Sequence, residues 1–222
     1  MRPLPTALLV VLALVACRRG PEVRPGQVVV LYSSRTPHLV PPCPDGRCAL
    51  VPLEGFTCPG LPAETVVVSG HGLPPLYAGH PAPEVAAAVA CFRPALLVLD
   101  TCYGASTPIL DALATAGVTP LVVAPPFLVP PGGFVYPPEF FAPGPVEDRA
   151  RLLSTTPPAP LLRWRLDPAG LRAVHEQVER LSPAERVRRR QRTRPPLVRL
   201  PLPSALAPDG AVLVPEPSEA RR

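Results

Sequence analysis

The feature that most constrains the fold of this chain is a regular alternation of short apolar runs and helix-like segments over residues 65–124. Three apolar runs have the length of buried strands: Thr65–Val68, Ala95–Leu99 and Thr119–Ala124. The two segments between them carry helix signals: Glu84–Phe92, with Pro83 in its first turn, and Pro108–Ala116, with Gly117 as its stop. This alternation predicts an α/β fold in which helices cover both faces of a mostly parallel sheet.

The segments on either side are rich in proline, of which the chain has 38. Before the alternation we expect a strand at Gln27–Tyr32 and a loop-rich insert over residues 35–63 with a possible strand at Ala49–Leu53. After it comes a loop of proline, glycine and aromatic residues over 125–145. The end of the chain predicts a helix from Asp167 to about Leu181, a second helix from Ser182-Pro183, and a hairpin within residues 201–215.

These signals divide the chain into four parts. Residues 1–16 indicate a secretory signal, 17–26 a tether, 27–166 the α/β domain, and 167–222 an irregular, helical and basic C-terminal segment. The last part holds seven arginines between Arg186 and Arg199. Such a run can bind nucleic acid or anionic lipid. For an exported protein we expect lipid head groups or a solvated face, and no nucleic acid.

The N-terminus indicates export. A charge at Arg2 precedes an apolar run, Ala7–Val15, that is far shorter than the roughly 20 residues needed to span a bilayer. The ending Leu14-Val15-Ala16-Cys17 resembles the lipobox of bacterial lipoproteins, which implies that Cys17 becomes the acylated mature N-terminus. The resemblance implies the cell envelope as location, and the outer membrane in a cell with two membranes because Arg18, not Asp, follows the cysteine. The alternative is an ordinary signal peptide with a chance cysteine.

The cysteine count indicates one thiol without a partner. Outside the cytoplasm cysteines tend to pair, and without Cys17 five of the six remain, an odd number. If Cys102 stays free, the others make an even set for two disulfides, with the pairing left open: Cys43, Cys48, Cys58 and Cys91.

Two candidate catalytic residues follow successive predicted strands. His71 comes just after the first strand of the alternation and Cys102 just after the second, so both belong at the carboxyl edge of the sheet, where ligands bind. A cysteine becomes a useful nucleophile when a nearby imidazole takes its proton. The N–H groups of Gly72 and Cys102 can together face the oxyanion of an attacked carbonyl. The pattern therefore predicts acyl-transfer chemistry.

At these residues the chain resembles the caspase-like superfamily of cysteine peptidases, which includes metacaspases, clostripain, legumain and the gingipains. The resemblance rests on VVVSGHG at 66–72 and LLVLDTCYGAS at 96–106, and it covers roughly residues 27–124. It implies a caspase-like three-layer α/β/α fold, a peptide or protein substrate and no cofactor. It further implies that His71 is the general base, Cys102 the nucleophile, Gly72 and Cys102 the oxyanion donors, and Asp100 the residue that selects Arg or Lys before the scissile bond.

The chain departs from the family in two respects. The region between the first strand and His71 lacks a clear helix. Only 30 residues separate His71 from Cys102, so the acidic loop that metacaspases place after the histidine is missing. Calcium dependence and substrate preference therefore stay open.

Other interpretations remain. Cys102 can be a buried small residue and His71 a hydrogen-bonded loop residue, or the fold can serve as an inactive binding module. His80 can pair with His71 at a metal, although no other ligand stands at suitable spacing and no metal site is expected. Arg35 follows the first strand, where caspases place an arginine for acidic substrates, and it competes with Asp100 as the selecting residue.

Overall fold

The computed structural model describes residues 23–130, 132–192, 197–201 and 211–215. The predicted signal segment 1–16, Cys17 and most of the predicted tether lie outside the described residues. Within those described, no helix has the length and apolar character needed to cross a membrane.

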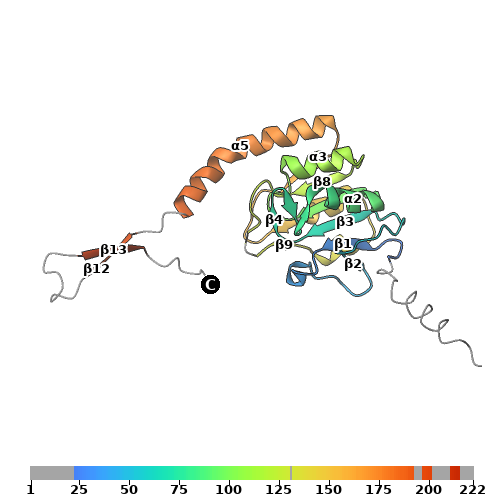
Figure 1. Ribbon diagram of the computed structural model, residues 1–222, viewed down its shortest axis with the longest axis horizontal. Coiled ribbons are helices and arrows are strands. Elements are labelled where there is room, and N and C mark those ends of the chain that lie inside the picture. Colours follow the sequence, from blue (N-terminus) through green and yellow to red (C-terminus); the bar gives the residue numbers. More distant parts are fainter. Residues whose placement is uncertain (1–22, 131, 193–196, 202–210, 216–222) are drawn as a thin grey trace, which may run out of the picture. The chain divides into compact units, whose positions relative to one another are not determined.

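A six-stranded sheet forms the centre of the first compact unit, which ends at His175 (Figure 1). Its order is β11-β8-β7-β3-β1-β2, and all strands run parallel except β11, which pairs antiparallel with β8. The strands span Val28–Tyr32 (β1), Cys48–Pro52 (β2), Thr65–Ser69 (β3), Leu96–Asp100 (β7), Leu121–Ala124 (β8) and Leu162–Arg165 (β11). The predicted mostly parallel α/β sheet is therefore confirmed.

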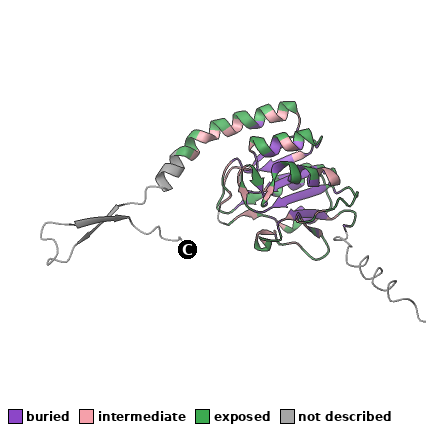
Figure 2. Cartoon of the chain, viewed as in Figure 1, coloured by how far each residue is buried: buried purple, intermediate pink, exposed green. Residues whose placement is uncertain are grey.

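The central strands are buried on both faces, as Figure 2 shows. One face carries an apolar cluster that includes Val30, Val67 and Val98 together with aromatic residues from beyond β8. Those covering residues belong to the 3-10 helix η2 (Pro138–Phe141), to helix α4 (Val146–Leu152) and to the segments next to them. On the other side lie α2 (Ala82–Phe92) and α3 (Thr107–Thr115), which pack against each other (Figure 1). The unit is thus a three-layer α/β arrangement.

Several short elements have no clear sequence signal. A three-stranded sheet of two-residue strands follows β3: β4 (Gly72–Leu73), β5 (Leu76–Tyr77) and β6 (His80–Pro81). Two more strands, β9 (Phe134–Val135) and β10 (Ser154–Thr155), pair antiparallel, and η1 spans Pro37–Leu39. Strands this short make no periodic pattern, so only tertiary pairing defines them.

The C-terminal region differs from the prediction in one respect. The two expected helices are one helix, α5 (Pro168–Arg192), which continues through Pro183. A proline removes only one intrahelical N–H donor, and the hydroxyl of Ser182 bonds back to the Val178 carbonyl at 2.7 Å. The second compact unit begins within α5 at Glu176. In it β12 (Leu197–Pro201) and β13 (Ala211–Pro215) pair antiparallel, and residues 202–210 between them lie outside the described ones.

Candidate functional site

The two candidate catalytic residues follow neighbouring parallel strands. β3 and β7 pair in a register that ends on Ser69 opposite Asp100. One residue further, the Gly70 N–H donates to the Asp100 carbonyl at 3.2 Å, so the two chains stay together past the strand ends. His71 and Cys102 therefore leave the sheet at the same edge.

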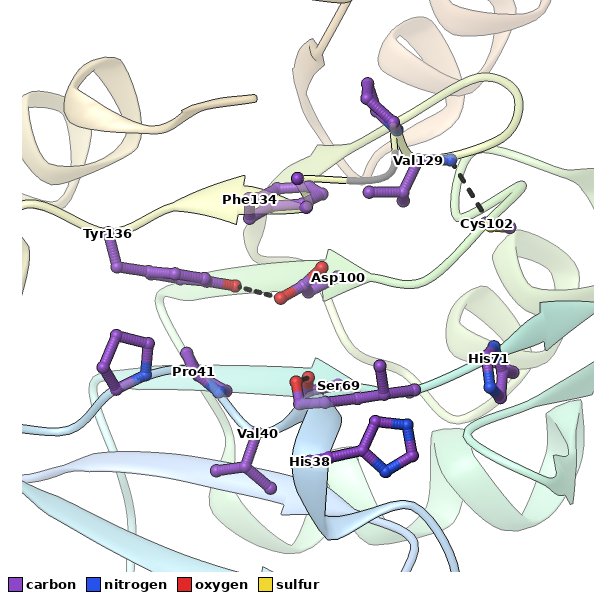
Figure 3. A pocket seen from close by; sticks show the side chains of 16 residues that line it. His38, Val40, Pro41, Ser69, His71, Asp100, Cys102, Val129, Phe134 and Tyr136 are labelled. Carbon is purple, nitrogen blue, oxygen red and sulfur yellow. Dashed lines mark hydrogen bonds between the residues drawn. The ribbon is translucent and has the colours of Figure 1, made fainter. Parts of the chain in front are cut away.

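A cavity of about 350 Å³ opens at this edge, and Asp100, His71 and Cys102 all line it (Figure 3). One wall is the segment from His38 to Pro42. The other wall is formed by residues of the loop after β8 and of β9: Val129, Pro130, Gly132, Gly133, Phe134 and Tyr136. The structure thus brings the predicted nucleophile, base and selecting carboxyl to one cavity of the size that small ligands and side chains occupy.

Gly72 lies against the backbone of Cys102. A Cβ atom built on Gly72 would stand 1.9 Å from the Cys102 carbonyl oxygen, so only glycine fits this close approach. The Ala78 N–H donates to the His71 carbonyl, which makes Gly72 and Tyr77 a non-hydrogen-bonded pair of the β4–β5 hairpin. The Gly72 N–H therefore points away from the β5 strand of the hairpin.

The Cys102 thiol makes a hydrogen bond on the side away from His71. Its Sγ accepts a hydrogen bond from the Val129 N–H at 3.3 Å, which Figure 3 marks with a dashed line. Among the described residues the exposed His71 ring makes no hydrogen bond to this sulfur. A proton transfer from Cys102 to His71 therefore requires that the two side chains turn toward each other. Catalytic hydrogen bonds often tighten in this way only in the substrate complex.

Asp100 lies on the face of β7 that the aromatic residues cover, the same face as Leu96 and Val98. Its Oδ2 accepts a hydrogen bond from the Tyr136 hydroxyl at 2.9 Å. Although part of the residue is accessible through the cavity, burial raises the pKa of the Asp100 carboxyl to about 7, against the opposing effect of this hydrogen bond. Burial, together with the neighbouring Asp100, also raises the pKa of Tyr136 well above its usual range.

The cysteine count is confirmed. Disulfides join Cys43 to Cys48 and Cys58 to Cys91, and Cys102 is the free cysteine of the described residues. The first disulfide directly follows the wall segment 38–42 and fixes its end to the start of β2. A hydrogen bond from the Ser69 hydroxyl to the Leu39 carbonyl, at 2.6 Å, holds the same segment to β3.

The competing candidate residues lie elsewhere. Arg35 does not line the cavity in the part of the chain that the structure describes, and Asp100 does. His80 contacts the carboxylates of Glu54 and Glu84, at 3.5 Å and 3.3 Å. No group of three or more potential metal ligands occurs within the described residues.

Three cavity residues were missed by the sequence analysis: His38, Ser69 and Tyr136. The aromatic residues after β8 have two places in the structure. Phe140 and Phe141 are buried in the core cluster. Tyr136 is also a member of that cluster, Phe134 packs against it, and both line the cavity.

The chain was also compared with known proteins. No protein-family model, no curated protein sequence and no solved structure matches it.

Proposed function

We propose that this chain is an exported, lipid-anchored cysteine peptidase of caspase-like type that cleaves peptide bonds after basic residues. The observation that carries the proposal is the shared cavity of His71, Cys102 and Asp100 at the carboxyl edge of a parallel sheet. Two further observations support it: Cys102 is the free cysteine of the described residues, and the Gly72 backbone lies against it. The sequence resemblance at both strand ends points to the same chemistry.

The proposed reaction starts when the Cys102 thiol turns from Val129 toward His71 and gives its proton to the imidazole. The thiolate sulfur then forms a bond to the carbonyl carbon of the substrate, and the N–H groups of Gly72 and Cys102 stabilise the oxyanion. The C–N bond breaks as the imidazolium of His71 protonates the leaving amine. Water, with His71 as base, hydrolyses the resulting thioester and restores the thiol. No metal or cofactor takes part in these steps.

One observation favours the second candidate, a non-catalytic envelope module that uses this cavity for binding. The Cys102 sulfur is hydrogen-bonded to Val129 and not to His71. Because this hydrogen bond holds the thiol in place without an imidazole, the cavity can bind a ligand without catalysing a reaction.

Covalent labelling separates the two candidates. The test uses the full chain and an arginyl acyloxymethyl ketone, which alkylates a nucleophilic cysteine at neutral pH. The peptidase proposal expects labelling of Cys102 that His71→Ala slows by about a hundredfold or more, the contribution usual for a general base. Cys102→Ala should remove the label and the cleavage of an arginyl reporter.

His38→Ala is the matched control, because His38 is the second imidazole on the same cavity and has no role in the proposed proton transfer. It should keep most of the labelling rate. Equal rates in the wild type and His71→Ala, with no turnover of any arginyl or lysyl reporter, would leave the binding module as the function.

A further inference from the structure

The cavity holds a carboxyl group without a cationic partner. Asp100 is the carboxylate among the described lining residues, and no arginine lines the cavity with it. The other titratable groups that face the cavity are His38, His71, Cys102 and Tyr136. A largely buried carboxyl in such surroundings is unfavourable as a charge until a cation or enough donors compensate it.

Tyr136 is the hydrogen-bond donor that the structure supplies to this carboxyl. Ser69 stands opposite Asp100 in the sheet register, but its hydroxyl is used on the Leu39 carbonyl. Within the described residues Asp100 Oδ1 receives no side-chain hydrogen bond, while Oδ2 accepts one from Tyr136. Only one of the two oxygens of this carboxyl therefore accepts a side-chain hydrogen bond.

The Tyr136 ring is fixed by its neighbours. Only 9% of its surface is exposed, and ring centroids lie 6.0 Å from Phe134 in a stacked arrangement and 5.2 Å from Phe140 in an edge arrangement. Figure 3 shows the hydroxyl directed at Asp100, with Phe134 on the same wall. A ring held this firmly keeps its hydroxyl, and through it the carboxyl, in one orientation.

We propose that Asp100 and Tyr136 form a single recognition unit for the guanidinium or ammonium group of a basic side chain, with Tyr136 as the specificity-determining partner. The free oxygen of Asp100 accepts from the cation, as in a charge-assisted hydrogen bond. The hydroxyl of Tyr136 holds the other oxygen, and the aromatic wall of Tyr136 and Phe134 flanks the alkyl part and the cation. The inference rests on the proposed function only in taking the bound group to be part of a peptide substrate.

The unit makes cation binding depend on pH. Asp100 is protonated below about pH 7 and charged above it, so the affinity for a cation should rise as the pH passes upward through this value. The hydrogen bond from Tyr136 favours the charged carboxyl, so removing the hydroxyl should move the rise to higher pH.

The test measures binding without catalysis. The full chain with Cys102→Ala is titrated with agmatine, a small guanidinium ligand, and with butylamine, by calorimetry between about pH 5 and about pH 9. In this background Tyr136→Phe keeps the ring and removes the hydroxyl. Agmatine affinity at neutral pH should fall about tenfold, the usual loss for a hydrogen bond to a charged group, and the midpoint of the pH profile should rise.

Asp100→Asn should remove most of the affinity, together with the pH dependence that Asp100 causes. Tyr32→Phe is the matched control, since Tyr32 does not line the cavity, and it should change neither affinity nor profile. Agmatine affinity that is unchanged in either Asp100→Asn or Tyr136→Phe would overturn the inference. Binding that follows these expectations while the wild type cleaves no basic reporter would uphold the recognition unit and defeat the peptidase proposal.

Discussion

One methyl group added at Gly72 should impair the proposed reaction more than it impairs folding. Its Cβ would stand 1.9 Å from the Cys102 carbonyl oxygen, so Gly72→Ala must push the β3 and β7 ends apart. Because the reacting groups tolerate little misplacement, we expect the labelling of Cys102 by an arginyl probe to fall about a hundredfold. The overpacked contact should also lower the free energy of unfolding by about 1–3 kcal/mol.

Gly144→Ala is the matched control for this variant. A Cβ there would meet no atom within 4 Å, so neither labelling nor stability should change by a measurable amount. Wild-type labelling in Gly72→Ala would mean that the Gly72 backbone has no part in the reaction.

Asp100 should make the stability of the fold depend on pH in an unusual direction. Its pKa of about 7 in the folded protein lies above the value of about 4 for an exposed aspartate. Between these values the folded protein keeps a proton that the unfolded chain has lost, so the free energy of unfolding should fall as the pH rises from about 4 to about 7. Denaturant midpoints measured across this range should show the decline in the wild type.

Asp100→Asn should flatten that part of the curve. Asp111→Asn, which changes an exposed carboxylate on α3, should leave the curve as it is in the wild type. A decline that is as steep in Asp100→Asn as in the wild type would show that other groups cause it.

At the scale of elements, the site depends on segments that the sheet alone does not fix. β3 and β7 bring the ends of two strands together by their register. The cavity walls, in contrast, are loops, and one of them is held by the Ser69–Leu39 hydrogen bond and the disulfide Cys43–Cys48. The other disulfide, Cys58–Cys91, connects the insert after β2 to the end of α2 and does not border the cavity.

The two disulfides should therefore contribute differently to the stability of the fold and to the cavity. Chain-entropy reasoning gives about 2 kcal/mol for the short Cys43–Cys48 loop and about 4 kcal/mol for the longer Cys58–Cys91 loop. The double variant Cys43→Ser/Cys48→Ser should lose agmatine affinity with a modest fall in melting temperature. Cys58→Ser/Cys91→Ser should lose more stability and keep the affinity at temperatures where it is folded. Equal affinities in the two double variants would show that the wall does not need its disulfide.

At the scale of the whole molecule, the proposed location depends on one residue outside the described part of the chain. If Cys17 carries the lipid, Cys17→Ser should release the protein from the membrane fraction or leave its signal segment uncleaved, since no other acyl attachment remains. Cys102→Ser is the control, because it removes a cysteine without touching the anchor. Fractionation and processing that do not change in Cys17→Ser would defeat the lipoprotein interpretation.

The order of strands and helices in the centre of the chain followed from the sequence. Valine-rich runs between Pro- and Gly-marked helices are local signals, and they predicted β3, α2, β7, α3 and β8 within a few residues of their observed bounds. Counting cysteines predicted one thiol without a partner, and its candidate role as a nucleophile pointed to Cys102, which is free in the described residues. The pairing of the other four did not follow from the sequence. The meeting of His71, Asp100 and Cys102 at one edge followed from parallel topology, which places the carboxyl ends of adjacent strands together.

Only the tertiary structure determined which residues line the cavity and how burial and hydrogen bonds affect their side chains. His38 and Tyr136 come from loops that are far in sequence from the candidate residues His71 and Cys102. No local sequence pattern shows that such distant segments lie close together in space. The raised pKa of Asp100 depends on its burial in the folded protein, and the hydrogen bond from Val129 to Cys102 depends on the path of a proline-rich loop. Local signals determined the elements here because the backbone and the alternation of side chains are local. The site needed the packed structure because desolvation and side-chain contacts are produced by residues from many parts of the chain.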